Sequence, residues 1–215
     1  MNMRVAVLCE VSGRVRDAFL AAGHDAISCD IEPSESPGPH IQGDCRDYDW
    51  SEYDLIVAHP PCTYLSNVGN RAMKEDQTGQ RKRKRYEAFI FFMWCYNLPV
   101  KMICVENPKG YINSHFRKPD QIIQPYFFGD REMKTTCLWL RGLSPLIHSE
   151  QDDLFFSKTH VEKPEPKYIL KSGKKKGQKV YFTEAHPGNS NKEASKNRSR
   201  TFPGIAAAMA AQWGG

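Results

Sequence analysis

Residues 4–30 decide the fold, and they read RVAVLCEVSGRVRDAFLAAGHDAISCD. The apolar run from Arg4 to Cys9 is typical of a buried strand, and the small residues from Glu10 to Gly13 predict a turn after it. Apolar residues at helical spacing predict a helix from Val15 to Ala22, and a second strand is expected from Ala26 to Cys29. The unit is therefore strand, turn, helix, strand.

The same alternation continues along the chain. Further strands are expected at 54–58, 100–105 and 135–140, and helices at 86–96 and 205–212. Strands that alternate with helices form mostly parallel sheets with helices on both faces. The sequence therefore predicts an α/β protein.

The composition is that of a globular protein of 215 residues, 40% hydrophobic and 26% charged, with a mean hydropathy of −0.59. No apolar run approaches the roughly 18 residues of a membrane span, and we expect neither a signal peptide nor a membrane partner. Seven cysteines, an odd number without a CxxC pair, argue against a disulfide framework or a zinc site. They favour a reducing cytoplasm.

Positive charge is concentrated in two stretches of a chain whose net charge is +5. Residues 71–85 hold seven Lys or Arg against two acids, and residues 151–200 hold twelve against six. Such stretches favour an anionic partner such as nucleic acid, although they also suit solvated surface. The candidate nucleic-acid-binding residues are Arg81, Lys82, Arg83, Lys84, Arg85, Lys174, Lys175 and Lys176.

The α/β pattern is interrupted between residues 148 and 200, where Lys, Glu, Pro, Gly and Ser dominate. Only 180–183 is strand-like there. We therefore expect one domain formed by residues 1–147 and 201–215, with 148–200 as a basic, loop-rich insert.

Four side chains with chemical potential follow predicted strands directly: Glu10, Asp30, Cys62 and Glu106. The carboxyl ends of parallel strands lie at one edge of a sheet, where α/β proteins bind ligands. We therefore expect these side chains to gather at that edge.

The first two acids suggest a nucleoside-containing cofactor. A strand, a turn of small residues and a helix place backbone N–H groups where they can hold a polar ligand. Asp30 lies seventeen residues after Gly13, near the spacing at which a carboxylate accepts ribose hydroxyls. Asp44 could accept from an adenine amino group. Each of these acids could equally cap a turn.

Cys62 stands apart from the other cysteines because Pro60 and Pro61 precede it and fix the backbone. A thiolate held there would be a strong nucleophile, whereas the usual role of a cysteine is structural. Glu106 follows the next predicted strand. Its carboxyl could engage an amidine-like face of a substrate or merely cap a turn.

The order of these motifs resembles that of the DNA cytosine-5 methyltransferases. The matching residues are Pro60-Pro61-Cys62 with Ser66 and Gly69, Val105-Glu106-Asn107, and Phe128-Gly129 before a strand. The resemblance covers 4–140 and 197–213. It implies a Rossmann-like methyltransferase fold, S-adenosylmethionine as cofactor, and methyl transfer to carbon 5 of cytosine in DNA.

The resemblance also implies roles for individual residues. The cofactor site would be lined by Cys9, Glu10, Ser12, Gly13, Asp30, Ile31, Asp44, Cys45 and Pro60. Cys62 would add to carbon 6 of the base, and Glu106 would hold the ring nitrogen and the exocyclic amine. The target base would leave the stack, and 81–85 lies where the family has a mobile loop.

The sequence departs from the family pattern at several places. His59 stands where the family has Gly, and Pro108 where it has Val. The family's two arginine positions after Gly129 fall on Lys134 and Thr136. The arginine that reaches the carbonyl oxygen of the pyrimidine would then be replaced, by Arg131 or by Lys134.

The insert of about fifty residues is short for the target-recognition domain of this family, and its lysines suit phosphates better than bases. We therefore expect low sequence specificity, a very short recognition site, help from a partner, or a small nucleotide substrate. A short enzyme of this kind would suit a phage or mobile element in a bacterial cell. Two alternatives remain open. The same chemistry could act on a free pyrimidine nucleotide or on RNA, or the chain could be a catalytically silent nucleic-acid-binding protein. The oligomeric state is not predicted.

Overall fold

The computed structural model describes residues 2–67, 70–152, 157–166, 168–173, 176–177, 179–181 and 200–215. The strands are β1 (Arg4–Leu8), β2 (Asp25–Asp30), β3 (His40–Gln42), β4 (Leu55–Ala58), β5 (Met102–Pro108), β6 (Gln121–Ile123), β7 (Thr136–Arg141), β8 (Tyr168–Ile169) and β9 (Lys179–Val180). The α-helices are α1 (Arg14–Ala21), α2 (Asn70–Lys74), α3 (Gln80–Tyr96), α4 (Tyr111–His115) and α6 (Pro203–Trp213). Two 3-10 turns are η1 (Cys45–Asp47) and η3 (Pro125–Phe128).

One seven-stranded sheet organises the chain, with the order β3-β2-β1-β4-β5-β7-β6. The strands from β3 to β5 are parallel, whereas β7 runs antiparallel to both of its neighbours. This confirms the predicted mostly parallel, Rossmann-like sheet. Because the chain moves from β1 to β2 on one side and from β4 to β5 on the other, the loops after β1 and β4 diverge. Such a switch point is where α/β sheets bind ligands.

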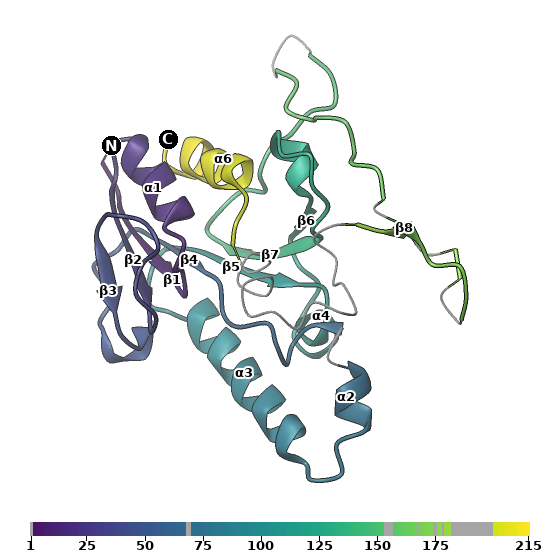
Figure 1. Cartoon of the computed structure of the whole chain (residues 1–215). Helices are drawn as coiled ribbons and strands as arrows, with labels where there is room; N and C mark the ends of the chain where they lie inside the picture. Colours follow the sequence, from purple (N-terminus) through teal and green to yellow (C-terminus); the bar gives the residue numbers. More distant parts are fainter. Residues whose placement is uncertain are drawn as a thin grey trace.

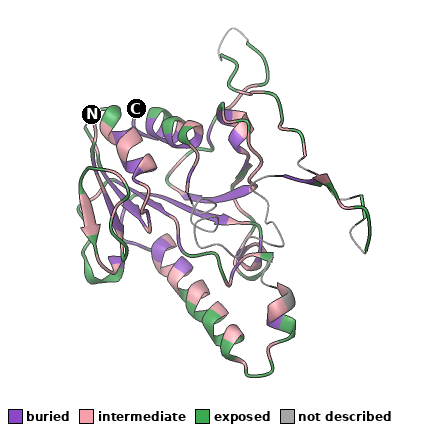
Figure 2. Ribbon diagram, viewed as in Figure 1, coloured by how far each residue is buried: buried purple, intermediate pink, exposed green. Residues whose placement is uncertain are grey.

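Helices cover both faces of the sheet, as predicted (Figure 1). Side chains alternate along a strand, so Val5 and Val7 of β1 pack in the core that α1 and α6 cover. Ala6 and Leu8 face the opposite core, which α3 covers. The central strands β1, β4 and β5 are buried along most of their length (Figure 2). Because they are covered on both faces, they read as continuous apolar runs in the sequence.

Helix α3 begins at Gln80, six residues before the predicted helix, so the basic run is helical. The charge of this run opposes the helix dipole. Asp76 offsets it, because its carboxylate accepts the backbone N–H groups of Arg81 at 2.8 Å and Thr78 at 3.1 Å. Gly79 supplies the left-handed turn before the helix, with φ 74°.

Strand β5 continues through Glu106 and Asn107 to Pro108, beyond the predicted end at Val105. The extension is made by the partner strand, since Asn107 pairs with Cys137 of β7. The sequence pattern of β5 alone could not reveal this pairing. Strands β3 and β6, each of three residues, and helix α4 were not predicted either.

The described parts of the insert include a small hairpin in which Tyr168 pairs with Val180. Figure 1 shows β8 on an arm that extends away from the sheet. Of the predicted strand at 180–183, Val180 ends β9, whereas residues 182–183 lie outside the described residues. The division of the chain at residues 148 and 200 stays a prediction. Within the described part of the chain, no helix has the length and apolarity needed to cross a bilayer.

Candidate active site

The loop after β4 presents Cys62. Among the seven cysteines, Cys62 is the exposed one, Cys9 is half-buried, and the other five are buried. The carbonyl oxygen of Cys62 accepts the backbone N–H groups of Leu65 at 3.0 Å and Ser66 at 2.9 Å, which forms a tight turn after it. Cys62 therefore lies in a turn at the carboxyl edge of the sheet, and its role as a nucleophile stays a prediction.

The loop that carries Cys62 is fixed from several sides. Asn107 donates from Nδ2 to the carbonyl oxygen of Pro60 at 2.8 Å, and Arg85 donates from Nε to that of Tyr64, also at 2.8 Å. The backbone N–H of Tyr111 donates to the carbonyl oxygen of Leu65 at 2.7 Å. Neighbours from β5, α3 and α4 therefore hold the loop in one arrangement.

Gly110 allows the closest of these approaches. Its backbone bridges to Ser66, and a Cβ at this position would overlap the carbonyl oxygen of Leu65. The glycine is therefore required by contact with the Cys62 loop. Its φ of 178° is extended backbone that any residue can adopt.

Glu106 is 8% exposed and lies among positively charged and polar groups. Its Oε1 lies 3.7 Å from Nζ of Lys134, and its Oε2 lies 3.1 Å from Nδ1 of His59. Thr201 donates from Oγ1 to Oε2 at 3.3 Å. Burial by itself would raise the pKa of Glu106, but Lys134, His59 and Thr201 together lower it to about 2.

Lys134 and Arg131, the two candidates for the missing arginine, lie in different places. Lys134 lies beside Glu106, and its Nζ also donates to the carbonyl oxygen of Arg200 at 3.1 Å. Arg131 is exposed and forms an ion pair with Glu162 of the insert. The structure therefore brings Lys134 to the acid and leaves Arg131 on the surface.

The start of the C-terminal segment completes this site. Arg14 donates from Nη1 to the carbonyl oxygen of Thr201 at 2.9 Å, and Arg200 pairs with Glu35 at 2.6 Å. The carboxylate of Asp130 accepts the backbone N–H of Gly204 at 2.8 Å. Residues nearly two hundred positions apart in the chain thereby meet next to Glu106.

A cavity of about 470 Å³ lies on the same edge of the sheet, at the carboxyl ends of β1 and β2. Five of the residues predicted to bind a cofactor line it, namely Cys9, Asp30, Ile31, Asp44 and Cys45. The loop after β4 contributes Pro61, next to the predicted Pro60. Helix α3 contributes Lys84, which the sequence analysis assigned to nucleic-acid binding instead, together with Glu87, Ala88 and Phe91, which the sequence did not point to.

The lining offers an acid beside apolar surface. Partial burial raises the pKa of Asp30 above its ordinary value, and its Oδ1 accepts the backbone N–H of Glu32 at 3.0 Å. Ile31 is 69% exposed at the rim, although it is apolar. A carboxylate next to an uncovered aliphatic side chain suits a ribose that carries a planar base.

Cys9 at the end of β1 has φ 59°, and it is the one residue other than glycine with positive φ among the described residues. The left-handed region costs about 1 kcal/mol or more for a residue with a side chain. Its backbone N–H donates to the carbonyl oxygen of Cys29 at 2.7 Å, which holds the bend. The strain lies where the chain turns out of β1 into the cavity wall.

Glu10, Ser12 and Gly13 do not line this cavity. The Glu10 carboxylate accepts the backbone N–H groups of Val15 at 2.8 Å and Arg16 at 3.2 Å, so it caps helix α1. Gly13 has φ 69° at the start of that helix. These residues shape the turn that borders the cavity.

Asp44 is engaged by a neighbour. Arg46 donates from Nε to its Oδ1 at 2.9 Å and from Nη2 to its Oδ2 at 2.5 Å. These hydrogen bonds lower the pKa of Asp44 to about 2. To accept from a ligand, this carboxylate would have to share its lone pairs with Arg46.

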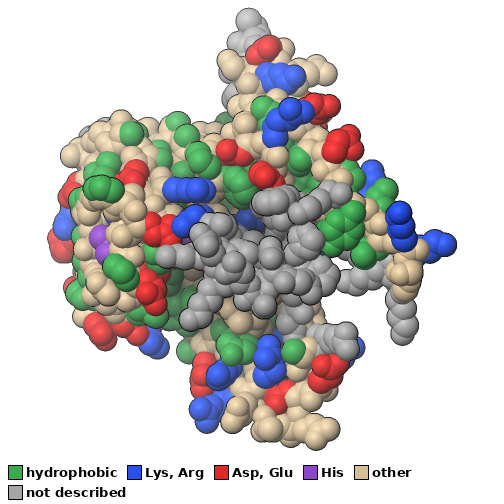
Figure 3. Space-filling view, viewed as in Figure 1, with side chains coloured by type: hydrophobic (Ala, Val, Ile, Leu, Met, Phe, Trp, Pro, Cys, Tyr) green, Lys and Arg blue, Asp and Glu red, His purple; other side chains and the backbone are tan. Residues whose placement is uncertain are grey.

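The basic run divides between two roles. Arg85 donates from Nη2 to Asn70 at 2.8 Å as well as to the Cys62 loop, and the Arg81 guanidinium lies over the Tyr64 ring at 5.4 Å. Lys82 and Arg83 are exposed instead. In Figure 3, Lys and Arg side chains gather on the lower lobe, which α2 and the start of α3 form.

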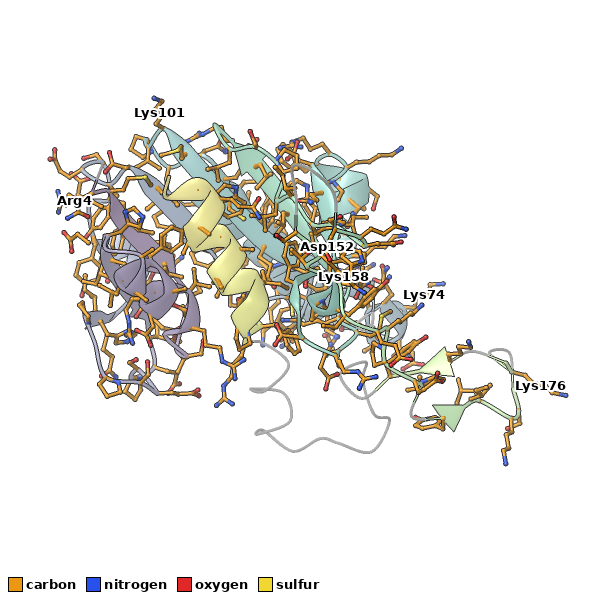
Figure 4. The ribbon with its side chains drawn as sticks, turned by 90° about the horizontal axis from the view of Figure 1, so that it is seen from above. Arg4, Lys74, Lys101, Asp152, Lys158 and Lys176 are labelled. Atoms are coloured by element: carbon orange, nitrogen blue, oxygen red, sulfur yellow. The ribbon has the colours of Figure 1, made fainter. Side chains whose placement is uncertain are left out.

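The lysines predicted in the insert are only partly placed. Lys176 is exposed on the turn that joins β8 to β9, and Figure 4 shows it on the arm far from the sheet. Lys174 and Lys175 lie outside the described residues.

No protein-family model and no curated protein matches this sequence. The fold is similar to those of solved methyltransferases. A prophage-encoded DNA modification methyltransferase from E. coli matches with a TM-score of 0.43 and 15% identity, over 79% of this chain and 57% of that one. The Dnmt2 methyltransferase of S. pombe matches with a TM-score of 0.43 and 19% identity, over 67% and 52%. A DNMT2 variant of Spodoptera frugiperda matches with a TM-score of 0.42 and 15% identity, over 77% and 58%.

The chain thus spans a little over half the length of each of these structures. At such identities the similarity says nothing about substrate, and the case for a function rests on the site itself. Sequence reasoning missed His59 as a site residue, although its departure from the family's glycine was a usable signal.

Proposed function

We propose that this protein transfers the methyl group of S-adenosylmethionine to carbon 5 of cytosine in DNA, through a covalent adduct with Cys62. The observation that carries the proposal is the meeting of three parts at one sheet edge. These are the rigid loop with its exposed thiol, the buried acid Glu106 with its two cationic neighbours, and the cavity on the same edge. A nucleophile, an acid that can hold a ring, and room for a donor are what this reaction requires.

The chemistry of the cavity lining fits the nucleoside half of the cofactor. Asp30 would accept the ribose hydroxyls, while Ile31 and Phe91 offer apolar surface to the adenine. When bound, S-adenosylmethionine supplies an electrophilic methyl group. The 470 Å³ volume is within the range of ordinary small-molecule sites.

The protein's own residues would act on the base in a defined order. The Cys62 thiolate forms a bond to carbon 6, which turns carbon 5 from a poor nucleophile into an enamine carbon. The Glu106 carboxylate accepts the N–H of the exocyclic amine and orients the ring against the thiol. After methyl transfer, water or hydroxide from the solvent takes the carbon 5 proton, the released electron pair re-forms the carbon 5–carbon 6 double bond, and Cys62 leaves as the thiolate.

DNA is preferred as substrate because exposed basic residues stand on the α2–α3 lobe and on the arm of the insert. A free nucleotide needs no such extended positive surface. RNA shares the phosphate chemistry and is an outcome of the test.

The experiment incubates purified protein with labelled cofactor and, separately, duplex DNA, RNA and dCMP, and then identifies the modified nucleoside by mass spectrometry. We expect 5-methylcytosine in DNA. Substitution Cys62→Ala should lower turnover by ~10³-fold or more while cofactor binding, measured by calorimetry, is unchanged. Thr63→Ala, an exposed neighbour of Cys62, is the matched control and should remain active.

DNA that contains 5-fluorocytosine should trap the adduct as a denaturation-resistant complex in the wild type and not in Cys62→Ala. Methylation by the Ala variant would disprove the covalent mechanism. Binding of DNA without any adduct or product would favour a catalytically silent protein.

A further inference from the structure

His59 is a titratable group in the centre of the site, and nothing so far assigns it a role. Its side chain is 10% exposed, and its Nδ1 lies 3.1 Å from Oε2 of Glu106. Its Nε2 is buried without a hydrogen-bond partner among the described residues, and its Nδ1, although close enough to Oε2 for an ion pair, is not aligned with it as a hydrogen bond. The backbone N–H of His59 donates to the carbonyl oxygen of Leu8 at 2.9 Å, so the backbone of His59 is fixed at the end of the central strands.

The charges that face His59 favour its protonated form. Glu106 on β5 and Glu10 after β1 are both carboxylates, and Lys134, before β7, is the cation that also acts on the ring. The Glu10 carboxylate accepts two backbone N–H groups of α1. The two carboxylates outnumber the single lysine, so the charges around the ring favour one further positive charge. Burial opposes that charge, but the carboxylates prevail and the pKa of His59 is raised.

Glu106 alone lacks the proton that the reaction needs. An ionised carboxylate can accept from the exocyclic amine of cytosine but has no proton to give to the ring nitrogen. An alkylammonium group ordinarily holds its proton to a pH near 10, whereas an imidazolium releases one near neutrality. His59 is in contact with Oε2, the oxygen opposite to the one that faces Lys134.

We propose that His59 is a positioning residue that holds the Glu106 carboxylate and supplies, through it, the proton taken up by ring nitrogen 3 of the target base. This inference rests on the proposed function. As the bond from sulfur to carbon 6 forms, the carbon 5–carbon 6 double bond moves to carbon 4–carbon 5, and the displaced pair on nitrogen 3 takes the proton. The imidazolium becomes neutral. The proton returns by the same route when the adduct breaks down, so the ring is recharged for the next turnover.

The first measurement is independent of catalysis. The pKa of His59 is obtained from the NMR titration of its ring protons, assigned by their absence in His59→Gln. We expect a midpoint above the ordinary value of about 6.5 in the wild type, and a lower midpoint in Glu106→Gln. Equal midpoints in the two proteins would overturn the pairing on which the inference depends.

The second measurement is the pH dependence of single-turnover methyl transfer. In the wild type the rate should fall as the pH rises through the His59 midpoint, because the proton is lost. His59→Gln keeps a hydrogen-bond donor without a titratable proton, so the rate should drop roughly 10- to 100-fold at pH 6.5 and this alkaline fall should vanish. His24→Gln, at the opposite edge of the sheet, should match the wild type, and circular dichroism checks that each variant is folded.

A purely structural role would lower the rate of His59→Gln while leaving the shape of its pH profile unchanged, and that result would overturn the inference. If the wild type transfers no methyl group to any substrate although the titration shows the pairing, the proposed function fails and takes the proton-supply role with it. The ion pair would then remain as a property of the fold alone.

Discussion

Two regions differ in how firmly their side chains are held: the carboxyl edge of the sheet that carries Cys62 and Glu106, and the exposed basic residues of the α2–α3 lobe and the insert arm. At this edge, the Cys62 loop is hydrogen-bonded to residues of β5, α3 and α4. Glu106 has an ion-pair partner at each of its two carboxylate oxygens. On the α2–α3 lobe and the insert arm, Lys82, Arg83 and Lys176 extend into solvent. Bond-making needs groups fixed to within fractions of an ångström, whereas attraction to phosphate depends on charge and tolerates movement.

After removal of the Cys62 thiol itself, the largest effect is expected from loosening the fixed edge. Gly110→Ala should place a Cβ against the carbonyl oxygen of Leu65 and displace the Cys62 loop. We expect a ~10- to 100-fold loss of methyl transfer and a loss of about 1–3 kcal/mol in the free energy of unfolding. Urea titration and single-turnover kinetics measure the two effects. Lys109→Ala, an exposed neighbour, should change neither, and a fully active Gly110→Ala would show that the loop is not held by this contact.

A smaller effect is expected in the cofactor cavity. Asp30→Asn removes the charge that would accept ribose hydroxyls, and cofactor affinity should fall by roughly 10-fold, as for a lost hydrogen bond to a charged group. Calorimetry with S-adenosylmethionine measures it. Asp25→Asn, at the other end of β2, serves as the control. Unchanged affinity in Asp30→Asn would remove this residue from the cofactor site.

Substitution of the exposed basic residues should have small effects that do not depend on exact side-chain geometry, unlike substitution at the fixed edge. Lys82→Ala and Arg83→Ala should weaken DNA binding only a few-fold, equally for all sequences, and each lost phosphate contact should reduce the salt slope by about 1. Fluorescence anisotropy at several salt concentrations measures both quantities. Lys101→Ala alters an exposed lysine at the far end of β5, which Figure 4 labels, and should have no effect. A sequence-dependent loss in Lys82→Ala would point to base contacts.

The smallest effect concerns acid stability. The Glu106 pKa of about 2 lies below the ordinary value near 4.3, so its ion pairs stabilise the protein at neutral pH. This contribution is complete above about pH 4.3 and is lost as the pH falls toward 2. The urea midpoint of the wild type should therefore fall more steeply than that of Glu106→Gln across this range. Glu165→Gln, exposed in the insert, should follow the wild type.

Local patterns were enough to predict the mostly parallel sheet and most of its strands. The apolar runs and the turn residues predicted β1, α1, β2, β4 and β7 to within one or two residues. Pro60 and Pro61 singled out Cys62, and the structure leaves that cysteine exposed while five others are buried. Patterns of this kind are visible in the sequence because burial on two faces demands continuous apolar runs.

What no local pattern could provide was the surroundings of each reactive group. From the sequence alone, Glu106 could have been a turn cap. In the structure, β5 pairs with β7, and Nζ of Lys134 lies 3.7 Å from Oε1 of Glu106. Arg131 and Lys134 were equal candidates until Arg131 was found with Glu162. The basic run did not indicate that Arg85 donates a hydrogen bond to the Cys62 loop.

The sequence by itself therefore determined the alternation of strands and helices, which cysteine is the candidate thiol, and the presence of acids at the strand ends. The tertiary structure alone decided which of these groups meet. His59, Glu106, Lys134 and Thr201 are far apart in sequence, and their mutual distances set the protonation of the acid. Electrostatic interactions depend on distance and burial, and both arise only when the chain has packed.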